Sequence, residues 1–97
     1  MAQVIIMPKL GFNMSEGKLV KWYKNIGESM SKGEPLFSIE TDKTNIDIEA
    51  TADGVLRQTF LAEGEAVEVT LPIAIVGEEG ENIDDMVAEV MSQLGNE

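Results

Sequence analysis

The chain repeats its turn-forming residues at an interval of 37 positions. The shift superimposes two pairs of glycines and one pair of prolines: Gly17 and Gly54, Gly27 and Gly64, Pro35 and Pro72. Because glycine and proline fix turns, their common register is harder to attribute to chance than matches of common residues. The repeat predicts two similar β-units, each unable to bury its apolar face alone, that pack as a small two-sheet sandwich with pseudo-twofold symmetry.

Short β-prone runs separated by glycine-marked turns indicate an all-β fold, a sandwich or a barrel. The expected strands are 3–7, 18–24, 36–41, 44–50, 55–61 and 73–76. At 97 residues, 43% of them hydrophobic, the chain is expected to form one domain. Trp22 and Tyr23 are neighbours on one strand, so alternation places one in the core and leaves the other partly exposed.

The C-terminal segment follows a different period. Its apolar residues recur at helical spacing: Ile83, Met86, Val87, Val90, Met91 and Leu94. Asn82 is a candidate cap and Gly95 follows the end, so a short helix is expected over 83–94, weak unless it packs on something. We therefore divide the chain into a β-domain over 1–78 and an acidic tail over 79–97 that contains this helix.

Charge is unevenly distributed along the chain. The net charge is −11, and residues 58–97 hold ten acidic residues and no basic one. This excess of negative charge disfavours nucleic-acid binding. It fits a surface that keeps the chain solvated, or one that attracts basic partners. The acidic pairs Glu78-Glu79 and Asp84-Asp85 have no partner that would hold a metal, and no metal is expected.

Several chemistries and locations are excluded or disfavoured by composition. The chain contains no cysteine and no histidine, which removes thiol nucleophiles and the usual general base. We expect no catalysis by this chain itself. The apolar run from Leu71 to Val76 is far too short to span a bilayer, and Met1–Ile6 does not resemble a signal peptide. No membrane association and a cytoplasmic location are expected.

The strongest local signal is the alternation on both sides of a turn at Asp42-Lys43. Counting outward from that turn pairs Glu40 with Asn45, Ile39 with Ile46, Ser38 with Asp47, and Phe37 with Ile48. The apolar pairs share one face and the polar pairs the other, and a slip of one residue would break this pattern. The register therefore places Lys43 at a hairpin tip. Asp-Lys is a poor choice for a tight turn, which suggests that the lysine is kept for its function.

The segment Glu40-Thr41-Asp42-Lys43-Thr44, between Gly27 and Gly54, resembles the lysine motif of the biotinyl/lipoyl superfamily. The resemblance covers residues 3–77, including Met7-Pro8-Lys9-Leu10 and the closing Pro72–Val76 segment. Biotinyl domains typically bracket this lysine with methionines, whereas Asp42 and Thr44 flank it here. The chain is thus most similar to the lipoyl domains of 2-oxo acid and acetoin dehydrogenase complexes.

This resemblance implies a flattened barrel of two four-stranded antiparallel sheets, with lipoate attached to Lys43 through an amide. It implies a swinging-arm carrier from an acyltransferase (E2) subunit of, for example, a pyruvate or acetoin dehydrogenase complex. The arm would collect an acyl group and electrons from a thiamine-dependent dehydrogenase (E1), deliver the acyl group to coenzyme A at the acyltransferase core, and be reoxidised by dihydrolipoamide dehydrogenase (E3).

Recognition residues are also implied by the resemblance. Asp42, Thr44 and Glu40 would present Lys43 to a lipoate ligase or lipoyl transferase, although Asp and Thr also serve simply to stabilise turns. The loop that the first dehydrogenase would read consists of Lys9, Leu10, Gly11, Phe12, Asn13, Met14, Ser15 and Glu16, or it is an ordinary connector. Two alternatives stay open: a biotin carboxyl carrier domain, and an adaptor module with an unmodified lysine.

Overall fold

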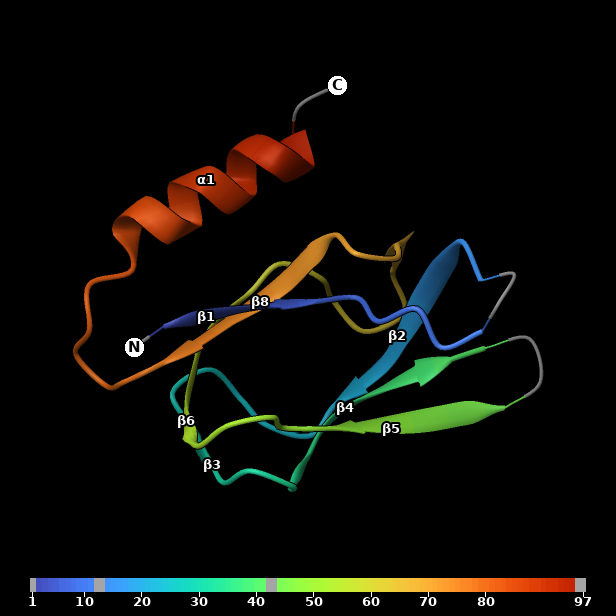
Figure 1. Cartoon of the computed structure of the whole chain (residues 1–97), viewed down its shortest axis with the longest axis horizontal. Coiled ribbons are helices and arrows are strands. Elements are labelled where there is room, and N and C mark those ends of the chain that lie inside the picture. Colours follow the sequence, from blue (N-terminus) through green and yellow to red (C-terminus); the bar gives the residue numbers. More distant parts are fainter. Residues whose placement is uncertain (1, 12–13, 42–43, 96–97) are drawn as a thin grey trace.

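A computed structural model of the chain describes residues 2–11, 14–41 and 44–95, which form eight strands and one helix (Figure 1). The elements are β1 (Gln3–Ile6), β2 (Glu16–Trp22), β3 (Ser29–Met30), β4 (Pro35–Glu40), β5 (Asn45–Glu49), β6 (Gly54–Thr59), β7 (Ala66–Glu68), β8 (Pro72–Gly77) and α1 (Asp84–Gly95). Their antiparallel pairing gives two four-stranded sheets, in the orders β1-β8-β6-β3 and β5-β4-β2-β7. The predicted fold class is confirmed. Only β3 and β7 were not expected individually, because two or three residues carry no readable alternation.

Two equivalent hydrogen bonds connect the two β-units. The donor of one bond and the donor of the other are 37 residues apart, and so are the two acceptors. The amide of Gly27 donates to the carbonyl of Leu56 at 2.7 Å, and the amide of Gly64 donates to the carbonyl of Leu19 at 2.7 Å. Both glycines have left-handed backbone, with φ of 94° at Gly27 and 91° at Gly64. Each unit thus inserts a tight turn against a strand of the other, as the sequence repeat predicts.

The core lies between the inner faces of the two sheets. Its buried residues are Met7, Leu19, Met30, Leu36, Phe37, Ile39, Ala50, Leu56, Leu61, Ile73, Ala74 and Val76. Trp22 packs on this core, with its ring centroid 5.4 Å from that of Phe37 and its indole N–H donating to the carbonyl of Leu61 at 2.9 Å. Tyr23 is exposed to 38%. The prediction that these aromatic neighbours would face opposite sides is confirmed.

Helix α1 covers the outer face of the first sheet (Figure 1). Ile83 and Val90 are buried with Ile75 of β8, and partly buried side chains of Phe60 and Leu94 pack against them. The predicted helix is therefore confirmed within one residue at each end. Its apolar stripe is buried against the sheet, which stabilises a helix that would be marginal alone.

The connector between β8 and α1 is held by one arginine and one glutamate. Arg57 Nη1 donates to the carbonyls of Glu78 and Glu81, both at 2.7 Å. The Glu81 carboxylate accepts hydrogen bonds from the amides of Ala2 and Glu78 at 2.9 and 3.0 Å. These bonds hold the pKa of Glu81 below its ordinary value, the Glu78 amide contributing most. The contacts cross the predicted boundary at residue 78, and the division into 1–78 and 79–97 stays a prediction.

Within the described ranges, no helix has the length and apolar character needed to cross a membrane.

The left-handed turn of Gly64 gives a test of the interlocking units. A β-carbon at Gly64 would meet no atom within 4 Å, so the cost of Gly64→Ala is conformational alone. We expect the free energy of unfolding to fall by about 1 kcal/mol in urea titrations. Gly95→Ala is the matched control, because Gly95 also lies in open space but without positive φ. An equal decrease in the free energy of unfolding in both variants would contradict the left-handed backbone of Gly64.

Candidate cofactor-attachment site

The β4–β5 hairpin has the register that the sequence predicts. The paired residues are Glu40 with Asn45, Ile39 with Ile46, Ser38 with Asp47, and Phe37 with Ile48. Beyond the last pair, the amide of Thr41 donates to the carbonyl of Thr44 at 2.8 Å. The two residues that separate these threonines, Asp42 and the predicted attachment residue Lys43, lie outside the described residues. The structure therefore describes both sides of the hairpin up to the tip.

Thr41 closes this end of the hairpin through its side chain. Its hydroxyl donates to the carbonyl of Thr44 at 2.8 Å and accepts from the amide of Thr44 at 3.3 Å. The hydroxyl of Thr44 itself donates at 3.4 Å to the carbonyl of Asn45. The sequence interpretation gave Thr44 a role and overlooked Thr41, although threonine next to a turn commonly bonds to the backbone in this way.

Glu40 is an exposed residue at the last described ladder position of β4. It pairs with Asn45 of β5 on one side and with Lys18 of β2 on the other. Thr44 and Asn45 are exposed as well. A modifying enzyme would thus meet polar side chains here, and the recognition roles of Glu40 and Thr44 stay predictions.

The stem of the hairpin is rigid because β4 is covered on both faces. Phe37 and Ile39 are fully buried in the core, and Ser38, on the opposite face, is buried to 4% exposure. On that outer face, the hydroxyl of Tyr23 donates to Asp47 Oδ1 at 2.9 Å, which braces β5. This bond raises the pKa of Tyr23 above 10.0, because the charged acceptor favours the neutral phenol.

The predicted recognition loop starts after β1 and runs into β2. The amide of Met14 donates to the carbonyl of Gly11 at 3.1 Å, and the amide of Leu10 donates to Met14 Sδ at 3.3 Å. The carbonyl of Ser15 accepts from Val69 at 3.0 Å, while Leu10 is 41% exposed. Lys9 is exposed too, and Glu16 is the first residue of β2. Phe12 and Asn13 lie outside the described residues.

This loop and the β4–β5 hairpin belong to the same end of the molecule. Figure 1 shows the described ends of both segments at one extreme of the long axis. The ladder agrees, because Lys18 of β2 pairs with Glu40 of β4. The loop is therefore placed where an enzyme at the hairpin tip would meet it, and its recognition role stays a prediction.

In the part of the chain that the structure describes, no three acidic side chains gather closely enough to hold a metal ion.

The fold and the hairpin together define a class of small domains built from two four-stranded antiparallel sheets. A family model described as "Biotin-requiring enzyme" (Biotin_lipoyl) matches residues 3–76. The chain belongs to this biotin/lipoyl family, and the resemblance seen in the sequence is confirmed.

Curated relatives and a solved structure resemble the chain as well. It is 42% identical over 89 residues to the pyruvate dehydrogenase E1 component subunit beta of Rhizobium meliloti, covering 88% of the chain and 19% of that protein. It is 35% identical over 85 residues to the dihydrolipoyllysine-residue acetyltransferase component of the acetoin cleaving system of Bacillus subtilis, covering 88% of the chain and 21% of that protein. The chain thus spans about a fifth of the length of these relatives.

The solution structure of the lipoyl domain of the 2-oxoglutarate dehydrogenase complex from Azotobacter vinelandii superimposes with a TM-score of 0.67 at 29% identity. The match covers 77% of this chain and 95% of that domain. The described barrel therefore corresponds to nearly all of a lipoyl domain, and the remaining part of the chain includes residues outside that fold.

The bracing contact of Tyr23 predicts a measurable titration. Tyr23 is the only tyrosine of the chain, so phenolate absorbance reports its pKa alone. We expect Asp47→Ala to lower this pKa toward the ordinary value of about 10, because the variant removes the acceptor and its charge. Since the folded-state pKa is raised, the stabilisation from this bond is present at neutral pH and is lost as the pH rises through that pKa.

Glu49→Ala is the matched control for Asp47→Ala. Glu49 is exposed on the same strand, two positions from Asp47, and its substitution removes the same charge. An equal decrease in the Tyr23 pKa in both variants would mean that general charge, and not the hydrogen bond, raises it.

Proposed function

We propose that the chain is a lipoyl carrier domain in which Lys43 forms an amide with lipoate. The observation that carries this proposal is the β4–β5 register, which leaves only Asp42 and Lys43 between the hydrogen-bonded Thr41 and Thr44. The sequence thus places a lysine between two paired strand ends, where attachment of a carried group would require it. Family membership supplies the second support, since the matched segment includes this lysine.

The lipoyl branch is favoured over the biotin branch by the flanking residues and by the relatives. Asp42 and Thr44 stand where biotinyl domains typically carry methionines. A relative from Staphylococcus saprophyticus, 38% identical over 84 residues, is named as the dihydrolipoyllysine-residue succinyltransferase component of a 2-oxoglutarate dehydrogenase complex. A multi-domain long-chain acyl-CoA carboxylase, 16% identical, shares the fold alone with a TM-score of 0.66. An adaptor with an unmodified lysine has no observation in its favour.

The residues of the chain fit an attached arm. Thr44 and Asn45 are exposed, while Phe37 and Ile39 lower in the hairpin are fully buried, so the described end of the hairpin is open to solvent and its stem is anchored in the core. When bound, lipoate supplies a disulfide that accepts an acyl group and two electrons. The chain contributes a rigid root and a tether, which replaces free diffusion with a high effective concentration at each active site.

The partners follow from this role. We propose that a lipoate ligase or lipoyl transferase modifies Lys43. The carrier then serves a thiamine-dependent dehydrogenase, an acyltransferase core and dihydrolipoamide dehydrogenase in turn. The loop from Lys9 to Glu16 would be read by the first of these enzymes. A cytoplasmic location stays a prediction.

Attachment at Lys43 is tested by intact mass after incubation with lipoate ligase, lipoate and ATP. We expect one adduct, with the mass of lipoic acid less one water, and none on Lys43→Arg. Lys32→Arg is the matched control, because Lys32 is an exposed lysine in a different turn of the chain, and this variant should be modified fully. Modification of Lys43→Arg, or an adduct formed with biotin ligase and biotin instead, would contradict the proposal.

The role of Thr41 is tested by its rate of lipoylation. We expect Thr41→Val to slow modification more than Thr44→Val does, because only the Thr41 hydroxyl bonds both backbone groups of Thr44. The free energy of unfolding should fall by about 1 kcal/mol in Thr41→Val. A larger rate effect in Thr44→Val would show that the ligase reads the Thr44 side chain directly.

A further inference from the structure

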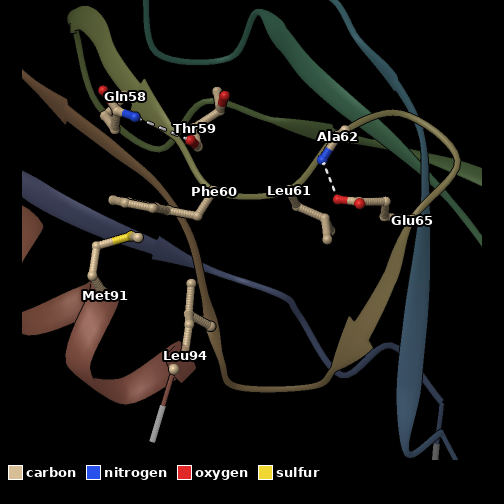
Figure 2. Close-up of a pocket in the computed structure, with 9 residues that line it drawn as sticks. Gln58, Thr59, Phe60, Leu61, Ala62, Glu65, Met91 and Leu94 are labelled. Carbon is tan, nitrogen blue, oxygen red and sulfur yellow. Dashed lines mark hydrogen bonds between the residues drawn. The ribbon is translucent and has the colours of Figure 1, made fainter.

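A groove lies between the C-terminal half of α1 and the segment that follows β6. Its volume is about 600 Å³, and it is lined by Gln58, Thr59, Phe60, Leu61, Ala62, Glu65, Met91, Leu94 and Gly95. Figure 2 shows Met91 and Leu94 of the helix on one side, with Phe60 and Leu61 opposite them. The groove is on the outer side of the sheet that does not contain the β4–β5 hairpin. It is therefore separate from the proposed attachment site.

The floor and walls of the groove are mainly apolar. Met91 is 56% exposed, although Met86, Val87, Val90 and Leu94 of the same helix belong to the cluster that packs with Ile75. Phe60 and Leu94 are only partly buried. A flexible methionine beside an aromatic ring offers an adaptable apolar contact for a partner side chain.

The electrostatic surroundings of the groove are negative. No lysine or arginine is among its lining residues, which include Glu65. Glu65 Oε1 accepts from the amide of Ala62 at 2.9 Å, which fixes the carboxylate there (Figure 2). The last turn of α1 has no basic residue to balance the partial negative charge of its terminal carbonyls. All ten charged residues from 58 to 97 are acidic.

We propose that this groove docks a segment of a partner protein that combines apolar side chains with lysine or arginine. The apolar residues would fill the space beside Phe60 and Met91, and the cations would lie against Glu65 and the end of α1. A second copy of this chain fits less well, because its net charge of −11 would oppose close approach. The interaction does not involve Lys43, so it goes beyond the carrier role.

Two synthetic peptides test the proposal by amide chemical shifts of the chain. One is a short amphipathic helix of leucine and lysine, and the other has the same leucine pattern with glutamate in place of lysine. We expect only the lysine peptide to bind, with shifts concentrated at Phe60–Ala62 and Met91–Gly95. Binding of both peptides, binding of neither, or shifts spread over the acidic surface would overturn the proposal.

A pair of variants separates docking in the groove from general attraction. Met91→Lys should weaken binding of the lysine peptide by about tenfold or more. Ile26→Lys is the matched control, because Ile26 is also 56% exposed and the change in charge is the same, but it does not line the groove. Equal weakening in both variants would overturn the proposal. So would groove shifts that depend on the chain's own concentration, because a second copy would then be the occupant.

Discussion

The structure depends on the mutual packing of two β-units, neither of which completes a sheet alone. β3 follows β2 in the first unit but pairs with β6 of the second, and β7 of the second unit pairs with β2 of the first. The bonds from Gly27 to Leu56 and from Gly64 to Leu19 lie beside these exchanged strands. Both sheets, and the core between them, therefore form only when the units combine. Such an arrangement favours cooperative unfolding as one body.

The same symmetry relates the hairpin that contains the proposed attachment residue to the turn that leads into the helix. Under the 37-residue shift, the segment 41–44 corresponds to 78–81, where the amide of Glu81 donates to the carbonyl of Glu78 at 3.1 Å. Gly80, with φ of 84°, stands at the position equivalent to Lys43. There the chain turns under the hold of Arg57 and continues into α1. Of the two segments that correspond in the repeat, one anchors the connector to α1, and the other contains the lysine proposed to bear lipoate.

The sequence was informative where a pattern is long and local, and silent where a contact is short or made by backbone. The β4–β5 register was predictable because apolar and polar pairs alternate over several residues, and the helix was predictable from its period. The clamp of Arg57 was not, because its acceptors are carbonyls that every residue possesses. Thr70 illustrates the same limit. It has φ of 75°, matching Gly33 at 94° in the other unit, yet a threonine gives no sign of left-handed backbone.

The charge of the chain changes within β6, near the start of the second unit. Residues 1–57 are nearly neutral, at −1, and contain the lysine hairpin and the loop beside it, whereas residues 58–97 carry −10. An enzyme that received an arm at its active site would have to approach the hairpin closely, and the small net charge of residues 1–57 adds little repulsion for partners of either sign. The acidic half, on which α1 lies, instead keeps carriers apart from one another and attracts basic segments. The groove between α1 and the segment after β6 does not share residues with the β4–β5 hairpin, so the proposed docking and the proposed attachment would not compete for one surface.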